Sequence, residues 1–206
     1  MRKVKLVMQI SVDGFSADAE GTPNWMVWPW SDDWKWDNRL RQYYIDLTTS
    51  SDCILLSRKM AEEGFHSHWE KLTQNPADPQ YAFAKPITEM RKLVFTKTLN
   101  ESVWKNTELV KGDSKNEIDR LKSEMGKDIL VYGGPTFASS LIKDGLIDEF
   151  HLFVNPTAVG VGRSMFKDID SKVELNLMGA TPYDCGVVVL KYSRKNDCGG
   201  SLPSEA

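Results

Sequence analysis

The feature that most constrains this chain is the segment 128–135, Asp-Ile-Leu-Val-Tyr-Gly-Gly-Pro, in which a short apolar run ends in two adjacent glycines. The run predicts a buried strand, and residues 136–143 predict a helix that follows at once. A strand that breaks on Gly133 and Gly134 brings bare backbone and a helix N-terminus to one place, where N–H groups and the helix dipole can face an anion. Paired glycines are also ordinary in tight turns. A binding site here therefore depends on what else in the chain converges on this turn.

Length and composition limit the classes of protein to consider. The 206 residues fit one domain, which we place at residues 1–195, and the Gly, Ser and Pro content of residues 196–206 predicts a disordered tail. The net charge of −3 argues against a general nucleic-acid-binding protein, which needs a basic surface. Apolar runs stay well below the ~20 residues that cross a bilayer, so we expect no membrane partner. Three cysteines without C-x-x-C spacing predict a reduced protein in the cytoplasm.

Hydrophobic periodicity predicts an α/β fold. Strands first alternate with helices, which predicts parallel pairing, and the last three strands have no long helix between them, which predicts antiparallel hairpins. The expected architecture is a mixed, mostly parallel sheet flanked by helices in a single domain. Residues 66–86 are polar and carry three prolines, so we predict a long surface excursion there. A capping box on Ser114 and Glu117 is expected to start one helix. The predicted strands are 3–12, 53–56, 93–96, 107–110, 129–132, 149–154, 172–177 and 186–192, and the predicted helices are 33–49, 58–63, 114–125 and 136–143.

Groups suited to binding anions stand at the ends of three predicted strands. Arg58 and Lys59 follow the second strand. Thr96 and Lys97 stand at the end of the third, and the glycine pair ends the fifth. An arginine fork suits a phosphate and lysine supplies a mobile point charge, although each pair alone could be a solvated strand end. Because the C-terminal ends of parallel strands meet at the edge where open α/β sheets bind ligands, we expect these groups to converge. The chain has neither G-x-G-x-x-G nor G-x-x-x-x-G-K-[ST], which excludes the Rossmann and P-loop modes.

Histidines and tryptophans are further candidates. His66 and His68 alternate in a segment without a nearby cysteine or acidic cluster, so we predict no metal site. His151 lies within a predicted strand, where we expect a packed or surface residue. Trp28 and Trp30 lie in a loop rich in tryptophan and proline, where they could frame a planar ligand, pack in the core, or do both.

Five motifs occur in an order that resembles a known family. They are Gln-Ile-Ser-Val-Asp-Gly at 9–14, Ile-Leu-Leu-Ser-Arg-Lys-Met at 54–60, Leu-Val-Phe-Thr-Lys-Thr-Leu at 93–99, Ile-Leu-Val-Tyr-Gly-Gly at 129–134, and Leu-Ile-Asp-Glu-Phe-His-Leu-Phe-Val-Asn-Pro at 146–156. Across residues 3–192 the chain is similar to the dihydrofolate reductase superfamily, and to the branch that contains the reductase domain of bacterial riboflavin biosynthesis. The resemblance implies a mixed sheet that binds NADPH along its strand ends.

The resemblance also implies which residues contact the cofactor. In such proteins the basic pair approaches the 2′-phosphate and pyrophosphate, the Thr-Lys pair approaches the adenosine, and the backbone near Gln9 meets the nicotinamide. The peptide between the two glycines is often cis. Two positions depart from the family: Ser57 stands where glycine is usual, and Met60 stands where threonine is usual. Methionine cannot donate the hydroxyl hydrogen bond that threonine gives to phosphate, and the loss of one such bond costs ~1 to 3 kcal/mol. The implied cofactor-binding residues are Gln9, Ile10, Ser57, Arg58, Lys59, Thr96, Lys97, Tyr132, Gly133, Gly134, Pro135, Thr136 and Phe137.

The activity implied by the resemblance is that of an NADPH-dependent reductase, which transfers hydride to a planar nitrogen heterocycle such as a pterin or a ribosylaminouracil. We expect Trp28 and Trp30 to contact this substrate. By analogy with the acid on the first long helix of dihydrofolate reductases, Asp33 and Asp37 are candidates for the catalytic carboxylate. We select Asp37, and the alternative for it is a solvent-facing helix acid. The rival function is that of a non-catalytic dinucleotide-binding or regulatory protein on the same fold.

The resemblance to the riboflavin branch further implies a homodimer. Residues 150–154 and 187–190 form apolar strands, and a partner commonly covers an edge strand that exposes apolar side chains. The alternative is that these strands complete the core of the monomer.

Overall fold

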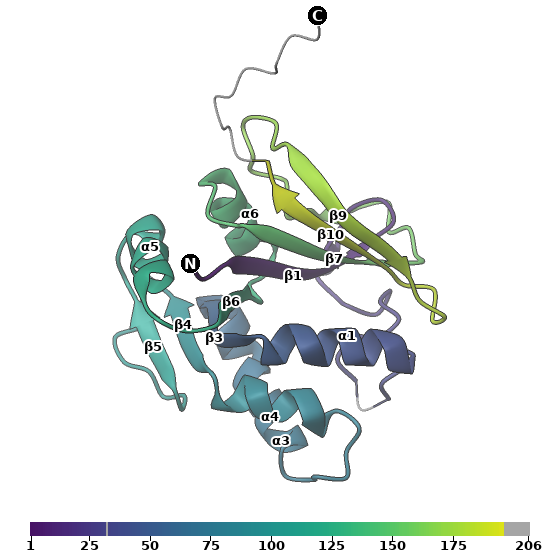
Figure 1. Ribbon diagram of the computed structural model, residues 1–206, viewed down its shortest axis with the longest axis horizontal. Coiled ribbons are helices and arrows are strands. Elements are labelled where there is room, and N and C mark those ends of the chain that lie inside the picture. The colour runs from purple at the N-terminus through teal and green to yellow at the C-terminus, as the bar shows by residue number, and fades with distance from the viewer. Residues whose placement is uncertain (32, 196–206) are drawn as a thin grey trace, which may run out of the picture.

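An eight-stranded sheet organises the chain, with the strand order β5-β4-β3-β6-β1-β7-β10-β9 (Figure 1). This computed structural model describes residues 1–31 and 33–195, so the predicted tail lies outside the described residues. All neighbours from β5 to β7 pair in parallel, and β10 pairs antiparallel with both β7 and β9. The predicted mixed, mostly parallel sheet in a single domain is confirmed. The strands are β1 (Val4–Ser11), β3 (Ser51–Ser57), β4 (Arg91–Phe95), β5 (Thr107–Val110), β6 (Asp128–Val131), β7 (Glu149–Asn155), β9 (Leu175–Pro182) and β10 (Val188–Arg194), and a separate ribbon pairs β2 (Ala17–Asp18) with β8 (Gly162–Arg163).

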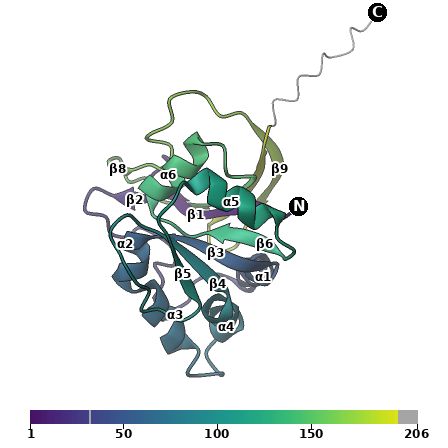
Figure 2. The same ribbon diagram turned by 90° about the vertical axis from the view of Figure 1, so that its left-hand side faces the viewer.

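Alternating side chains along the strands divide the interior into two cores. In β3, Ile54 and Leu56 belong to one core, whereas Cys53 and Leu55 belong to the other. Helices α1, α3 and α4 cover the first face of the sheet, and α5 and α6 cover the second (Figures 1 and 2). Within residues 1–31 and 33–195, each helix is too short or too polar to cross a membrane. The helices are α1 (Asn38–Thr49), α2 (Arg58–Met60), the helical turn η1 (Ala61–Phe65), α3 (His66–Leu72), α4 (Tyr81–Glu89), α5 (Ser114–Ser123) and α6 (Pro135–Lys143).

The start of α5 differs from the prediction. Asp113 caps this helix, because its carboxylate accepts a hydrogen bond from the backbone N–H of Asn116 at 3.0 Å. Ser114 is already inside the helix, so the predicted capping box is wrong: an acid one residue earlier takes the capping role. The helix ends at Ser123, and Met125 is fully exposed instead of extending the apolar stripe.

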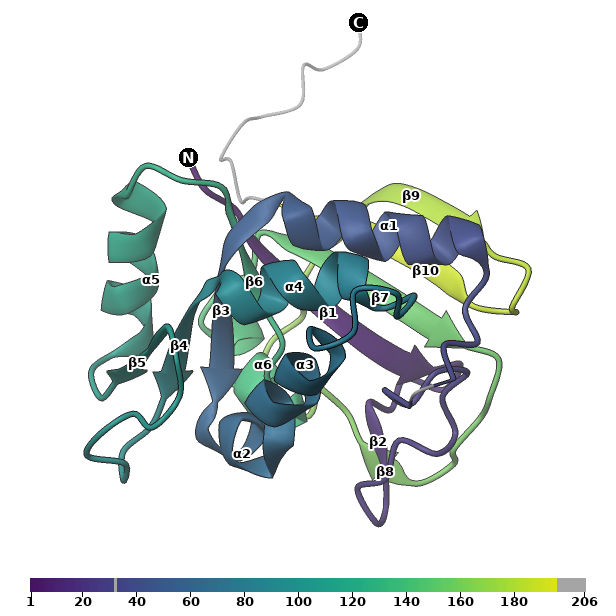
Figure 3. The ribbon, with the colours of Figure 1, turned by 90° about the horizontal axis from the view of Figure 1, so that it is seen from below.

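Residues 66–86 are not the predicted surface excursion, because two helices, α3 and α4, pack against the sheet there (Figure 3). Phe65, Trp69 and Leu72 are buried and recur at helical spacing. Phe83 and Ile87 of α4 are fully buried in the same core. The burial of these large side chains decides the structure, and the polar residues between them face solvent.

The late strands occupy different places in the sheet from those predicted. β7 lies between β1 and β10, and β10 lies between β7 and β9, so neither is an edge. The edge strand on this side of the sheet is β9, which runs from Leu175 to Pro182 and extends beyond the predicted 172–177. Leu177 and Met178 of β9 are 61% and 49% exposed. The apolar strands 150–154 and 187–190 therefore complete the monomer core, and the exposed apolar edge belongs to β9.

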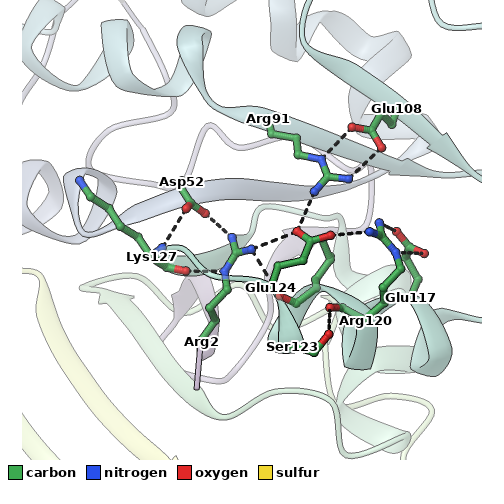
Figure 4. Close-up of polar contacts among 10 residues, drawn as sticks. Arg2, Asp52, Arg91, Glu108, Glu117, Arg120, Ser123, Glu124 and Lys127 are labelled. Atoms are coloured by element: carbon green, nitrogen blue, oxygen red, sulfur yellow. Dashed lines mark hydrogen bonds and ion pairs between the residues drawn. The ribbon is translucent and has the colours of Figure 1, made fainter.

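A network of ion pairs ties the N-terminal segment to the strands and to α5 (Figure 4). The Arg2 side chain is buried and donates hydrogen bonds to the carbonyl of Lys127 at 2.6 Å and to the carboxylate of Asp52. Its guanidinium also approaches Glu124 at 3.5 Å. Glu124 in turn pairs with Arg91 of β4 at 3.0 Å. One buried guanidinium thus joins β3, the start of β6 and the end of α5.

We predict that Arg2→Met lowers the free energy of unfolding by about 1–3 kcal/mol, because the partly buried acceptors of its buried guanidinium lose their donor. Urea denaturation monitored by circular dichroism measures the change. Lys115→Met is the matched control, since its exposed pair with Asp119 contributes within ~0.5 kcal/mol. Equal stability of the two variants would contradict a structural role for the network.

Candidate functional site

A cavity of about 340 Å³ opens at the C-terminal ends of β1 and β6. Its volume lies in the range of about 300–1,000 Å³ that is typical of small-molecule sites. Figure 3 shows α2 and α3 beside the sheet. The segment that contains these two helices contributes one wall of the cavity. The walls are mainly apolar. They comprise Val7, Met8 and Gln9 of β1, Ser16, Met26 and Trp30 of the following loop, Met60, Glu63, Gly64, Phe65, His68 and Trp69 of the α2–α3 segment, and Tyr132, Gly133, Gly134 and Pro135 of the β6–α6 turn.

The glycine turn contains two residues with different surroundings. A Cβ atom added to Gly133 would collide with the Phe137 ring, so a larger residue fits there only if this ring moves. A Cβ atom added to Gly134 would meet nothing within 4 Å, and its φ of −65° suits any residue. Gly134 is the N-cap of α6, so the open space lies directly before a helix N-terminus. The described residues contain no cis peptide bond, so the expected cis bond between the glycines is wrong.

The predicted strand-end groups lie along one edge of the sheet, because β4, β3, β6 and β1 are consecutive parallel neighbours. Arg58 pairs with Glu62 at 2.6 Å, and Lys59 pairs with Glu63 at 3.4 Å. These side chains are about half exposed, so the pairs are weak and a stronger anion can replace them. The edge therefore combines two exchangeable cations with the open backbone at Gly134.

Two hydroxyl groups at this edge have local partners. Ser57 caps α2, because its Oγ accepts a hydrogen bond from the backbone N–H of Met60 at 3.2 Å. Ser57 thus stabilises the start of the helix that carries the basic pair. The Thr96 hydroxyl accepts hydrogen bonds from the backbone N–H groups of Thr98 and Leu99 at 3.2 and 3.1 Å. These contacts shape the turn after β4.

Gln9 supplies a fixed polar group within the cavity wall. Its Nε2 donates to the carbonyl of Trp28 at 3.1 Å, and its Oε1 accepts from Asn155 at 3.3 Å. Both ends of the amide are therefore held in place. The neighbouring Ile10 side chain belongs to the core on the opposite face and does not line the cavity. Thr136 and Phe137 follow the glycine turn but also stand outside the lining.

The structure separates the two tryptophans predicted to contact substrate. Trp30 lines the cavity, and its ring packs on Trp69 and Trp28 at centroid distances of 5.2 and 4.9 Å. Its φ of 63° is unusual for a bulky residue, so this packing holds a strained backbone in place. Trp28 is fully buried at the centre of an aromatic cluster that includes Trp36 and Phe83, and it does not line the cavity.

Asp37, the candidate catalytic acid, does not reach the cavity. It caps α1 by accepting hydrogen bonds from the backbone N–H groups of Arg39 and Leu40 at 3.0 Å. Its second oxygen accepts from the N–H of Cys185 at 3.2 Å. Burial raises the pKa of Asp37, but these N–H groups outweigh burial and hold the pKa below its usual value. The carboxylate therefore anchors the helix start to the turn before β10.

The histidines have separate environments. His66 lies on α3, where its Nε2 is 3.1 Å from the Thr107 hydroxyl and its ring stacks on Trp104, and burial lowers its pKa to about 4. His151 is buried in β7, with Nδ1 2.5 Å from the Tyr43 hydroxyl. In the part of the chain that the structure describes, no group of three or more His, Cys, Asp or Glu side chains is placed to hold a metal ion.

Sequence reasoning missed one wall of the cavity. His68 and Trp69 lie in the segment interpreted as a surface excursion, and Glu63 and Phe65 lie just before it. The available signal was the spacing of Phe65, Trp69 and Leu72, which matches one face of a helix. The three prolines in residues 66–86 instead favour an irregular surface segment.

Comparison with known proteins identifies relatives of this chain. Residues 2–189 match the family model of the RibD C-terminal domain. The uncharacterized protein YyaP of Bacillus subtilis (strain 168) is 27% identical over 193 residues, which cover 93% of this chain and 94% of that protein. A Thermotoga maritima diaminohydroxyphosphoribosylaminopyrimidine deaminase/5-amino-6-(5-phosphoribosylamino)uracil reductase has a TM-score of 0.63 at 16% identity, over 94% of this chain and 57% of that one. A dihydrofolate reductase from Enterococcus faecalis complexed with NADP(H) has a TM-score of 0.56 at 14% identity, over 94% and 97% of the two chains.

The sheet order and the match to these structures define a dihydrofolate-reductase-like α/β fold. The chain belongs to the RibD C-terminal domain family. The resemblance to the dihydrofolate reductase superfamily, and to its riboflavin branch, is therefore confirmed.

We predict opposite effects of alanine at the two adjacent glycines on stability. Gly133→Ala should lower the free energy of unfolding by about 1–3 kcal/mol, because the new methyl group collides with the Phe137 ring. Gly134→Ala should be neutral or stabilise the fold by up to ~1 kcal/mol, since its backbone conformation suits alanine. Thermal and urea unfolding of the two variants test the difference. Similar destabilisation by both would show that the open space before α6 is filled in solution.

Proposed function

We propose that this protein is an NADPH-dependent reductase that transfers hydride to a planar nitrogen heterocycle in the cytoplasm. The observation that carries the proposal is the open space at Gly134. The fold does not require a glycine there, yet the position opens onto a helix N-terminus and an apolar cavity. An anionic cofactor that approaches the backbone closely accounts for both features.

The residues at the strand ends fit NADPH in the following way. The N–H groups in the first turn of α6 have no partner within the helix and can hold the pyrophosphate. Arg58, Lys59 and Lys97 supply the positive charge for the 2′-phosphate, and Thr96 lies toward the adenosine. The nicotinamide end then enters the cavity beside Gln9. When bound, the cofactor supplies the hydride.

The protein's own contribution is to orient the two rings and exclude water. Trp30 and the methionines of the cavity provide flat, apolar surfaces on which a heterocycle can lie. Among the described residues, three titratable side chains line the cavity and are candidates for proton transfer, namely Glu63, His68 and Tyr132. Burial raises the pKa of Tyr132 to about 12, so its phenol stays protonated near neutral pH. Asp37 has no place in this scheme, because its carboxylate is engaged with backbone N–H groups elsewhere.

Titration with NADPH and NADH, followed by tryptophan fluorescence, tests the cofactor site. We expect Arg58→Ala to weaken NADPH binding roughly tenfold, about 1.4 kcal/mol, and NADH binding less, because only NADPH carries the 2′-phosphate. Gly134→Ala should weaken both, since its methyl group enters the space assigned to the pyrophosphate. Arg39→Ala on α1 and Gly179→Ala on β9 are the matched controls, and both should leave binding unchanged. Equal losses for both cofactors in Arg58→Ala would contradict the 2′-phosphate assignment.

The rival is a dinucleotide-binding or regulatory protein without catalysis. Tight NADPH binding without NADPH oxidation by any of a panel of pterins and related heterocycles would favour that rival. Oxidation of NADPH in step with loss of one heterocycle would favour the reductase.

We also propose a homodimer, now assigned to the β9 edge instead of the interior strands. Leu177 and Met178 are exposed on this edge, and an apolar edge strand is a surface that a partner commonly covers. Light scattering at micromolar concentration should give a mass near twice 23.4 kDa. Leu177→Asp should shift the mass toward the monomer, whereas Val103→Asp, at another exposed position, should not. A monomer mass for the unaltered protein would refute the dimer.

A further inference from the structure

We propose that the cavity selects an uncharged, unphosphorylated planar substrate that carries apolar substituents. This inference rests on the proposed reductase function and narrows the substrate class of the same site. It follows from the charge and the hydrogen-bonding capacity of the residues that line the cavity.

The first argument is charge. Within the described residues, the cavity lining contains no arginine and no lysine, and its one carboxylate is Glu63. Arg58 and Lys59 stand outside the lining and are paired with acids on the next turn. Away from the Gly134 end, which the proposed cofactor occupies, a phosphate group in the cavity would lose its hydration without gaining an arginine or a lysine, and it would face a carboxylate of its own sign. The cavity therefore disfavours a phosphorylated substrate.

The second argument is hydrogen bonding. Gln9 is the amide side chain in the wall, and its Nε2 and Oε1 are already bonded to Trp28 and Asn155. The Ser16 hydroxyl donates to the carbonyl of Arg163 at 3.0 Å, so the remaining polar side chains of the wall are Glu63, His68 and Tyr132. A ring with more donors and acceptors than these can serve would bury unpaired polar groups, which is unfavourable. A substrate with few polar edges avoids this cost.

The third argument is the nature of the walls. Met8, Met26 and Met60 face the same cavity as Trp30 and Trp69. Methionine side chains are flexible and polarizable, so they adapt to substituents of different shapes, and the indole rings offer flat apolar contact. Such walls discriminate by apolar surface instead of by a fixed pattern of hydrogen bonds.

The test uses two 7,8-dihydropterins that share one ring, one with an alkyl side chain and one with the same chain ending in a phosphate. With saturating NADPH, we expect the alkyl compound to have a kcat/KM at least tenfold higher, and its Kd from tryptophan quenching to be lower by a similar factor. Equal or better use of the phosphorylated compound would overturn the inference while leaving the reductase proposal intact. If neither compound oxidises NADPH, the reductase proposal fails for these rings, and the two Kd values still decide the charge preference.

A charge reversal provides a second measurement. Glu63→Lys places a cation on the cavity wall at an exposed side chain, so the fold should tolerate it. It should lower the Kd of the phosphorylated compound at least fivefold relative to the Kd of the alkyl compound. Glu70→Lys is the matched control, because it makes the same change in net charge on α3 at a residue that does not line the cavity. Equal tightening by both variants would show that net charge, and not the cavity wall, sets the preference.

Discussion

The parallel pairing of β6 between β3 and β1 is the constraint on which the site depends. Because these strands run in the same direction, their C-terminal ends meet at one edge, and the glycine turn opens there beside the end of β1. The three apolar residues of β6 are fully buried, as a central parallel strand requires. A shift of register in β6 would move Gly133 and Gly134 away from Gln9 and separate the turn from the cavity.

The aromatic core explains why the cavity is apolar and why the cations lie outside it. Trp28 is fully buried, and Trp30 and Trp69 extend the same cluster to the cavity wall. The cavity is thus the open margin of a hydrophobic core. Arg58 and Lys59 stand on α2 at the surface, where solvent reduces the desolvation of a charge. This division into a charged rim and an apolar interior suits a ligand with an anionic end and a neutral ring.

The strand-end groups could be predicted from the sequence, whereas much of the cavity wall could not. The end of a parallel strand is set by local pattern, so the sequence predicts one common edge for Ser57, Thr96 and Gly133, and the strand order agrees. Trp69 was missed, because prolines nearby outweighed a short helical pattern. Asp37 was misplaced for a different reason: an acid at a helix start can cap the helix or face a cleft, and only its contacts with Cys185 and the first turn of α1 distinguish the two.

By itself, the sequence determined the class of fold, the order of most strands and helices along the chain, and the existence of a glycine turn before a helix. These follow from hydrophobic period and backbone sterics, which act over a few residues. Only the tertiary structure decided the different surroundings of neighbouring residues of the same type. Gly133 packs against Phe137 while Gly134 borders open space, and Trp28 fills the core while Trp30 lines the cavity. The physical reason is that the direction of a side chain, and what it meets, are fixed by how α6, α1 and α3 pack on the sheet, which is set by contacts between residues far apart in the chain.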